Sequence, residues 1–295
     1  MHLLTTAQQD RLRHLARRSP AFIGMRIVVH ADHVEISHPE PLELGFESLS
    51  ATLAGAPTGE WPDLVDDHFR RAIALGTADG SDLQGPADAV LQRTYLRLAP
   101  SDSGVSEVAS YAAEVTPGLL QVFAFDRPDS IVVMKDEDVL RHGYDLLYDA
   151  GAENLARELP DGYFEADGVY YLQGSDYVGS LVLIVPWVIE AVTGVAEAPH
   201  GALVAMPARD QFVFHVIRDR DTAGVLAALD EVGRLAAECH ANSAYQLSSR
   251  VYWWRPLPVG GLETVGHHNG AGMVTYYSGD FEDMLFNVGL EYGTA

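Results

Sequence analysis

Strand-like segments come in pairs separated by short turns, and this pairing is the feature that most limits the folds open to the chain. In these segments apolar residues alternate with polar ones or form short apolar runs, which is typical of β-strands. Around Ala31-Asp32 the pattern is that of a β-hairpin, and Asp126-Arg127-Pro128-Asp129 is a strong turn signal between two other strands. The predicted pairs are 25–30 with 33–37, 119–125 with 130–134, and 202–206 with 211–217.

Helical patterns lie between these strand pairs. In 61–73, for example, apolar residues recur every three or four positions, as on the buried face of an amphipathic helix. Clustered strands with interspersed helices favour an α+β fold, with mixed or antiparallel sheet segments and packed helices, over a regular βαβ series. The other predicted helices lie within 4–18, 136–159, 178–192 and 225–236, and single strands are predicted at 91–98, 169–172, 250–254 and 273–277.

A loop rich in Gly, Ala and Asp, residues 76–85, separates two parts of the chain. We predict an N-terminal helix-hairpin-helix unit over 1–75, a main α+β domain over 86–255 and a Gly-rich C-terminal extension over 256–295. The alternative is one compact domain, because the separating loop is too short to require independent domains.

The chain carries 42 acidic and 19 basic residues, for a formal net charge of −23. Such a surface repels the phosphate backbone of nucleic acids and anionic membranes, so neither is an expected partner. It attracts a basic protein, and salt weakens that attraction. The simpler interpretation is that the charge keeps the protein soluble.

Cys239 is the single cysteine, so no intrachain disulfide forms, which fits a reducing compartment. The N-terminal stretch is polar and Arg-rich and lacks the apolar segment of a signal peptide. The longest apolar run, 178–195, contains Ser180, Pro186 and Glu190, and we expect a buried helix there because a bilayer needs roughly 20 mostly apolar residues. These features together predict a cytoplasmic protein.

Motifs of several common enzyme classes are absent. The only lysine, Lys135, is not in a Gly-Lys-Ser/Thr phosphate loop, no histidine is followed by glutamate as in His-Glu-x-x-His, and no Gly-x-Ser-x-Gly occurs. We predict no cofactor, and the absences favour a protein without catalytic activity. They do not decide whether the chain is an enzyme.

Two groups of residues leave metal or thiol chemistry open. His30, His33 and His38 lie near the predicted hairpin, where Asp32 or Glu35 would add a ligand, but an exposed polar hairpin is the simpler interpretation. Cys239 and His240 are adjacent, although a thiolate nucleophile needs its base within hydrogen-bond reach, which adjacency on a helix does not ensure. We assign no catalytic or metal-binding residue.

Two segments are candidates for contact with a partner or ligand. Tyr252, Trp253 and Trp254 form an aromatic strand in which Trp253 faces away from its two neighbours, so one side is either core or an exposed contact surface. Arg209 and Asp210 follow Met206-Pro207-Ala208 at a turn between two strands, and their side chains point to different sides. A turn held by local hydrogen bonds is the simpler interpretation of this pair.

Several ordered stretches between Trp61 and Trp254 resemble the YtpQ-like family of bacterial proteins, a family of unknown function. They include Ala152-Glu153-Asn154-Leu155, Tyr170-Tyr171-Leu172, the element Gly174–Ser180, and Val204-Ala205-Met206-Pro207-Ala208-Arg209-Asp210. The resemblance implies a compact α+β unit over about 61–254 and adds Asn154 to the candidate contact residues. It implies no activity and no catalytic residues.

The leading hypothesis is a non-catalytic protein-interaction module that binds a basic partner, with an immunity-like or inhibitor role as one form. The alternatives are a metal-assisted hydrolase that uses His and carboxylate ligands, and a small-molecule binding protein in which Tyr252–Trp254 form part of the wall. The sequence does not indicate an oligomeric state.

Overall fold

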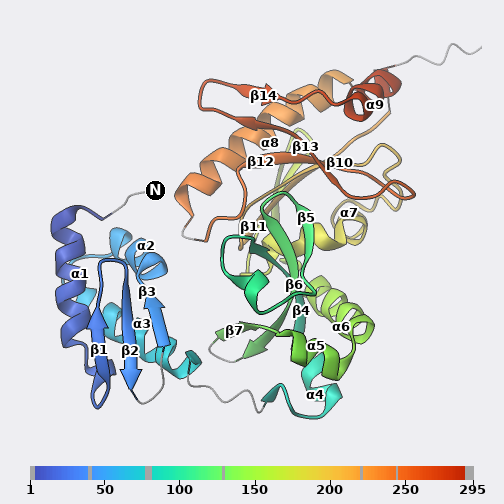
Figure 1. Cartoon of the computed structure of the whole chain (residues 1–295). Helices are drawn as coiled ribbons and strands as arrows, with labels where there is room; N and C mark the ends of the chain where they lie inside the picture. Colours follow the sequence, from blue (N-terminus) through green and yellow to red (C-terminus); the bar gives the residue numbers. More distant parts are fainter. Residues whose placement is uncertain are drawn as a thin grey trace, which may run out of the picture. The chain divides into compact units, whose positions relative to one another are not determined.

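The computed structural model describes residues 4–38, 42–76, 82–127, 130–219, 222–243 and 245–289, and these residues form two compact units (Figure 1). Unit 1 comprises Met1–Asp82 with Pro128–Ser130, and unit 2 comprises Leu83–Arg127 with Ile131–Ala295. The division after Asp82 falls inside the predicted 76–85 loop, of which 77–81 lie outside the described residues. Helices together with three antiparallel sheets confirm the predicted α+β class.

Unit 1 is a three-stranded antiparallel sheet with helices packed around one core. The predicted hairpin is confirmed, with Val29 opposite Val34, and a third strand that was not predicted extends the sheet in the order β1-β2-β3. Trp61 and Phe69 are the largest fully buried side chains of this core. The elements are α1 (Thr6–Arg18), η1 (Pro20–Phe22), β1 (Arg26–Val29), β2 (His33–His38), β3 (Leu42–Gly45), α2 (Glu47–Gly55) and α3 (Trp61–Gly76).

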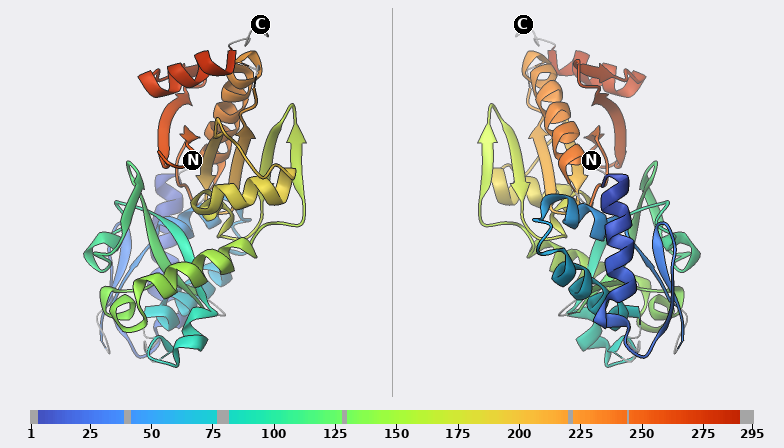
Figure 2. Two further views of the ribbon diagram at one scale, coloured as in Figure 1. Left: turned by 90° about the vertical axis from the view of Figure 1, so that its right-hand side faces the viewer. Right: turned by 90° about the vertical axis from the view of Figure 1, so that its left-hand side faces the viewer.

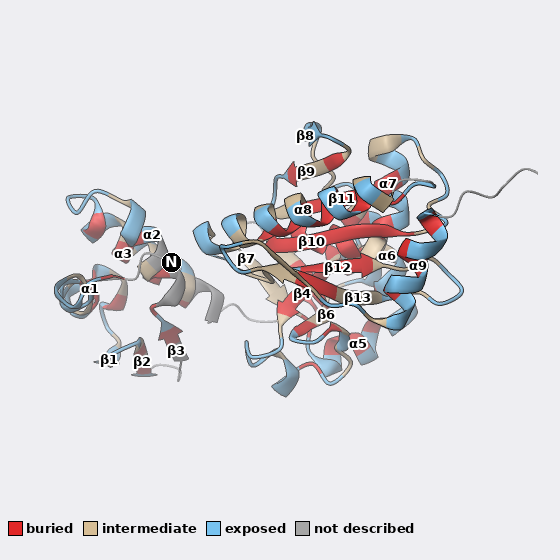
Figure 3. Cartoon of the chain, turned by 90° about the horizontal axis from the view of Figure 1, so that it is seen from above, coloured by how far each residue is buried: buried red, intermediate tan, exposed pale blue. Residues whose placement is uncertain are grey.

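Unit 2 is built on a seven-stranded antiparallel sheet in the order β14-β13-β12-β10-β11-β9-β8. Its central strand β10 is buried along its whole length (Figure 3). The predicted pairing of 202–206 with 211–217 is confirmed by the β10–β11 ladder. The strands are β8 (Tyr163–Ala166), β9 (Val169–Gln173), β10 (Ala202–Ala208), β11 (Gln211–Val216), β12 (Arg250–Trp254), β13 (Leu262–His268) and β14 (Met273–Thr275).

A second sheet in unit 2 contains the predicted pair 119–125 and 130–134, now β6 and β7, although residues 128–129 of the turn between them lie outside the described residues. The strand predicted at 91–98 begins later, because Leu91 still belongs to a short helix. The elements are α4 (Ala87–Leu91), β4 (Thr94–Pro100), η3 (Val105–Glu107), β5 (Ala113–Thr116), β6 (Leu119–Arg127), β7 (Ser130–Val133), α5 (Asp136–His142) and α6 (Tyr144–Ala156).

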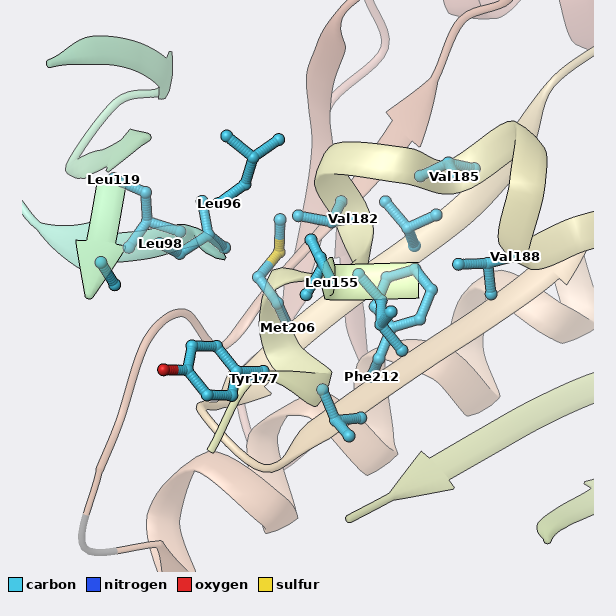
Figure 4. Packing of buried hydrophobic residues seen from close by; sticks show 14 of the residues in the cluster. Leu96, Leu98, Leu119, Leu155, Tyr177, Val182, Val185, Val188, Met206 and Phe212 are labelled. Atoms are coloured by element: carbon cyan, nitrogen blue, oxygen red, sulfur yellow. The ribbon is translucent and has the colours of Figure 1, made fainter. Parts of the chain in front are cut away.

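Side chains alternate across the seven-stranded sheet, so its two faces contribute to two different cores. On one face, Met206 and Phe212 pack with Leu98 and Val182 in the first core (Figure 4). On the other face, Leu203 and Val213 belong to the second core, which is covered by α8 (Thr222–Asn242) and α9 (Gly279–Gly289), the long orange and the red helix of Figure 2.

The predicted C-terminal extension is part of unit 2 as far as Gly289. β13 pairs with β12, with Glu263 opposite Trp253, and β14 continues the sheet. Phe281 of α9 is fully buried in the second core. Gly260, Gly261, Gly270 and Gly272 lie in the loops on either side of β13, with positive φ, and residues 290–295 lie outside the described chain.

The helix predicted over 178–192 is divided into the 3-10 helix η4 (Val178–Ile184) and the α-helix α7 (Val185–Thr193). Pro186 lies in the first turn of α7, where backbone N–H groups have no carbonyl partner within the helix, so the absence of an N–H in proline costs no hydrogen bond. Among the described residues, no helix has the length and apolar character needed to cross a membrane.

Asn154 joins three elements of unit 2 and generates a stability prediction. Its Nδ2 donates to the carbonyls of Leu91 (2.8 Å) and Thr94 (2.7 Å), and its Oδ1 accepts from Arg157 (2.8 Å). The residue is only 4% exposed. Asn154→Ala leaves two carbonyls without these partners, so we expect the free energy of unfolding in a urea titration to fall by about 2–3 kcal/mol.

The control for this prediction is Asn242→Ala. Asn242 also donates through Nδ2 to a backbone carbonyl, that of Glu238 at 2.9 Å, but it lies on the surface of α8. We expect a loss within about 0.5 kcal/mol. Equal losses from the two variants would show that Asn154 does not connect α4, β4 and α6 in the way described.

Candidate functional site

A groove of about 450 Å³ lies between α8 and the outer strands of the seven-stranded sheet, and we call it the α8 groove. Its strand side includes Phe164 from β8 and Tyr171 from β9, and Gln211 begins β11. Its helix side includes Glu231, Arg234, Glu238 and Cys239. The groove thus combines an aromatic floor with a charged rim.

The two periodicities of the chain explain which residues line the groove. In α8, positions 231, 234 and 238 are spaced by three and four, so their side chains share one face of the helix. In β9, Tyr171 faces α8, whereas its neighbour Leu172 faces the first core. Phe164 is directly opposite Tyr171 in the β8–β9 ladder and is 67% exposed.

The rim holds two carboxylates and one guanidinium. Arg234 donates to both oxygens of Glu231, at 2.9 and 2.7 Å, and through Nη1 to Glu238 at 2.8 Å. The hydrogen bond from Arg234 lowers the pKa of Glu231, so this side chain is a carboxylate at neutral pH. These pairs are open to solvent, and we expect each to add at most about 1 kcal/mol to stability.

The pKa values of two groups within the groove respond to burial and to the charges around them. Burial raises the pKa of the Cys239 thiol, and the nearby carboxylates of Glu238 and Asp210 raise it further, while a hydrogen bond with Tyr171 and the charge of Arg234 act in the opposite direction. Burial also raises the pKa of Tyr171, with Asp210 again contributing. The field of Asp210 therefore reaches the α8 side of the sheet.

Arg209 and Asp210 form the turn between β10 and β11, which Ala208 and Gln211 close as a pair. Three backbone hydrogen bonds fix this turn from outside: Tyr245 O accepts from Arg209 N (3.1 Å), Arg209 O accepts from Gly179 N (2.7 Å), and Asp210 O accepts from Gly174 N (3.0 Å). The Arg209 guanidinium lies over the ring of Tyr245, 5.0 Å from its centroid. The turn predicted from the sequence is present, and it is held by residues distant in the chain.

The aromatic residues Tyr252–Trp254 form the end of β12, and their side chains are directed into the two cores. Tyr252 is buried in the first core and its hydroxyl is 2.7 Å from that of Ser248. Trp253 is buried in the second core, where its Nε1 donates to the carbonyl of His200 at 2.8 Å. Trp254 is half-buried against the first core. None of the three lines the α8 groove, and a contact role for them stays a prediction.

Of the six residues predicted as contacts, Asp210 is the one whose charge acts in the groove, while Asn154 lies in the interior between α4, β4 and α6. Sequence reasoning missed Tyr171, Glu231 and Glu238. The spacing of Glu231, Arg234 and Glu238 on one helix face was a usable signal. The approach of Tyr171 to that face was not, because it depends on the order of the strands.

The histidines near the hairpin form two separate pairs with carboxylates. The rings of His30 and His33 stack with centroids 4.3 Å apart, but His30 contacts Glu35 (3.1 Å) and His33 contacts Asp32 (2.8 Å). The side chain of His38 lies outside the described residues. Within the described parts of the chain, no group of three or more His, Cys, Asp or Glu side chains is placed to hold a metal ion.

The thiol of Cys239 tests the electrostatics of the groove directly. It is the only thiol in the chain, so the rate of alkylation by iodoacetamide reports on one residue. Asp210→Asn removes a charge that opposes the thiolate, so we expect the pH–rate curve to move to lower pH and alkylation at a fixed pH below the midpoint to become faster. Glu190→Gln, at an exposed position of α7 and outside the groove lining, removes the same charge and should leave the curve in place. An unchanged curve for Asp210→Asn would place its carboxylate away from the groove.

Comparisons with models of protein families, with curated proteins and with solved structures find no significant match to this chain. The resemblance to the YtpQ-like family stays a prediction. The function is therefore argued from the residues of the chain itself.

Proposed function

We propose that this chain is a non-catalytic protein-interaction module that binds a basic partner through the α8 groove. The observation that carries the proposal is the charged rim of the groove, where the two carboxylates of Glu231 and Glu238 outnumber the one guanidinium, that of Arg234, among the lining residues. A cationic side chain that enters the groove gains a favourable electrostatic interaction with these carboxylates.

The composition supports the same proposal at longer range. An excess of 42 acidic over 19 basic residues attracts a basic protein before contact and raises the rate of association, most strongly at low salt. The attraction by itself is not specific. Specificity would come from the groove, where the carboxylates have fixed positions.

The floor of the groove suits the apolar part of a basic side chain. The exposed ring of Phe164 and the ring of Tyr171 provide aromatic faces, against which an Arg or Lys of the partner gains cation–π and packing contacts. Its charged end would then reach Glu231 or Glu238. β8 forms one end of the sheet order and its four residues are exposed, so an extended segment of a partner has room beside it.

An inhibitor or immunity-like role fits this arrangement, because an acidic groove would neutralise a basic surface on a toxin or nuclease. A small-molecule binding protein is the second candidate, favoured by the volume of the groove, which lies in the range of ligand pockets. The ligand would be cationic. The metal-assisted hydrolase has no supporting ligand group in the described residues.

A pair of double variants separates binding in the groove from general attraction. Glu231→Gln with Glu238→Gln removes two charges from the groove, and Glu190→Gln with Glu197→Gln removes two exposed charges elsewhere. The ligands are a fluorescent Arg-rich peptide and a fluorescent small organic cation, both measured by anisotropy from about 0.05 M to about 0.5 M salt. We expect the groove variant to bind at least about tenfold more weakly and the control to change little.

Equal weakening by the two double variants would show that the attraction is only a property of the net charge. Absence of binding to every ligand at low salt would reject the protein-interaction proposal. Binding that requires the groove but only accepts small organic cations would favour the second candidate.

A further inference from the structure

Arg97 is a buried charge whose hydrogen bonds are incomplete. Its side chain is 7% exposed, and its Nη1 has no hydrogen-bond partner in the structure as described. The one carboxylate paired with it, that of Asp176, lies 3.9 Å from Nη2 and is itself 47% exposed. A buried guanidinium with so little compensation is costly, which makes it a candidate for binding an external group.

The surroundings of Arg97 hold the guanidinium in place. It lies over the ring of Tyr177, 5.2 Å from the centroid, and that ring stacks on Tyr95 at 4.3 Å. The Tyr177 hydroxyl donates to Asp126 at 3.0 Å, so that carboxylate already has a partner. Because β4 and the first turns of η4 are part of the first core, the position of Arg97 is set by rigid elements.

A second guanidinium belongs to the turn that is hydrogen-bonded to η4, the element that follows Tyr177. Arg209 accepts at its carbonyl from Gly179, two residues after Tyr177, and its guanidinium lies over Tyr245. Burial lowers the pKa of Arg97, and the positive charge of Arg209 lowers it further. No ion pair joins Arg209 to a carboxylate among the described residues. In a chain with more than twice as many acidic as basic residues, two neighbouring arginines with so few carboxylates are unusual.

We propose that Arg97 and Arg209 form a binding site for a small oxyanion, a carboxylate or phosphate group, on the side of the seven-stranded sheet away from the α8 groove. Guanidinium groups present planar, paired N–H donors that match the geometry of both groups. The oxyanion accepts from Nη1 of Arg97 and from Arg209, and the rings of Tyr177 and Tyr245 hold the two donors. Arg209 is partly exposed and Tyr245 is exposed, so this end of the site faces solvent.

The test measures the melting temperature of the full chain in sodium phosphate, sodium acetate and sodium chloride at equal ionic strength. We expect phosphate or acetate to raise it above the value in chloride, because a ligand of the folded state stabilises it. The arm with the larger rise identifies the preferred oxyanion. Isothermal titration with the same salt should show binding at least about tenfold weaker for Arg209→Gln, as expected for loss of a charged hydrogen-bond donor.

Two further variants keep the test decisive. Arg218→Gln removes an exposed arginine beyond the other end of β11 and should leave the response unchanged. Asp176→Asn removes the competing carboxylate and should tighten binding. The proposal would be overturned if the melting temperature in phosphate and in acetate did not exceed that in chloride. It would also be overturned if Arg209→Gln responded to these salts as the wild type does. The response of the Glu231→Gln, Glu238→Gln variant should equal that of the wild type, so failure of the protein-interaction proposal does not affect this result.

Discussion

The contact between Gly179 and the turn at the end of β10 is the constraint on which both candidate sites depend. A Cβ at position 179 would lie 2.3 Å from the carbonyl oxygen of Ala208, so only glycine permits this approach. The approach brings Gly179 N to 2.7 Å from the carbonyl of Arg209. Through this bond the start of η4 fixes the turn, and the turn fixes the positions of Arg209 and Asp210.

Two consecutive residues of this turn, Arg209 and Asp210, therefore act on opposite faces of the seven-stranded sheet. The charge of Asp210 acts on Tyr171 and Cys239 beside α8, and the charge of Arg209 acts on Arg97 beside η4. β10 is buried along its full length between the two cores, so apolar side chains separate the acidic groove from the guanidinium pair. This separation lets one chain present sites of opposite charge.

The features predicted from the sequence are those set by neighbouring residues. The hairpin around Ala31-Asp32, the β10–β11 turn and the alternation of Tyr252 and Trp253 depend on residues a few positions apart. The α8 groove and the surroundings of Arg97 depend on strand order and on contacts across about 80 residues, such as that between Leu98 and Ser180, which no local pattern shows.

The most direct test of this account measures two responses on the same preparations of Arg209→Gln and Asp210→Asn: the pH dependence of Cys239 alkylation and the melting shift in phosphate. If the turn divides its charges between the two faces, Asp210→Asn changes only the thiol and Arg209→Gln changes only the response to phosphate. If either substitution alters both responses to a similar extent, the two sites are not separate, and the account is contradicted.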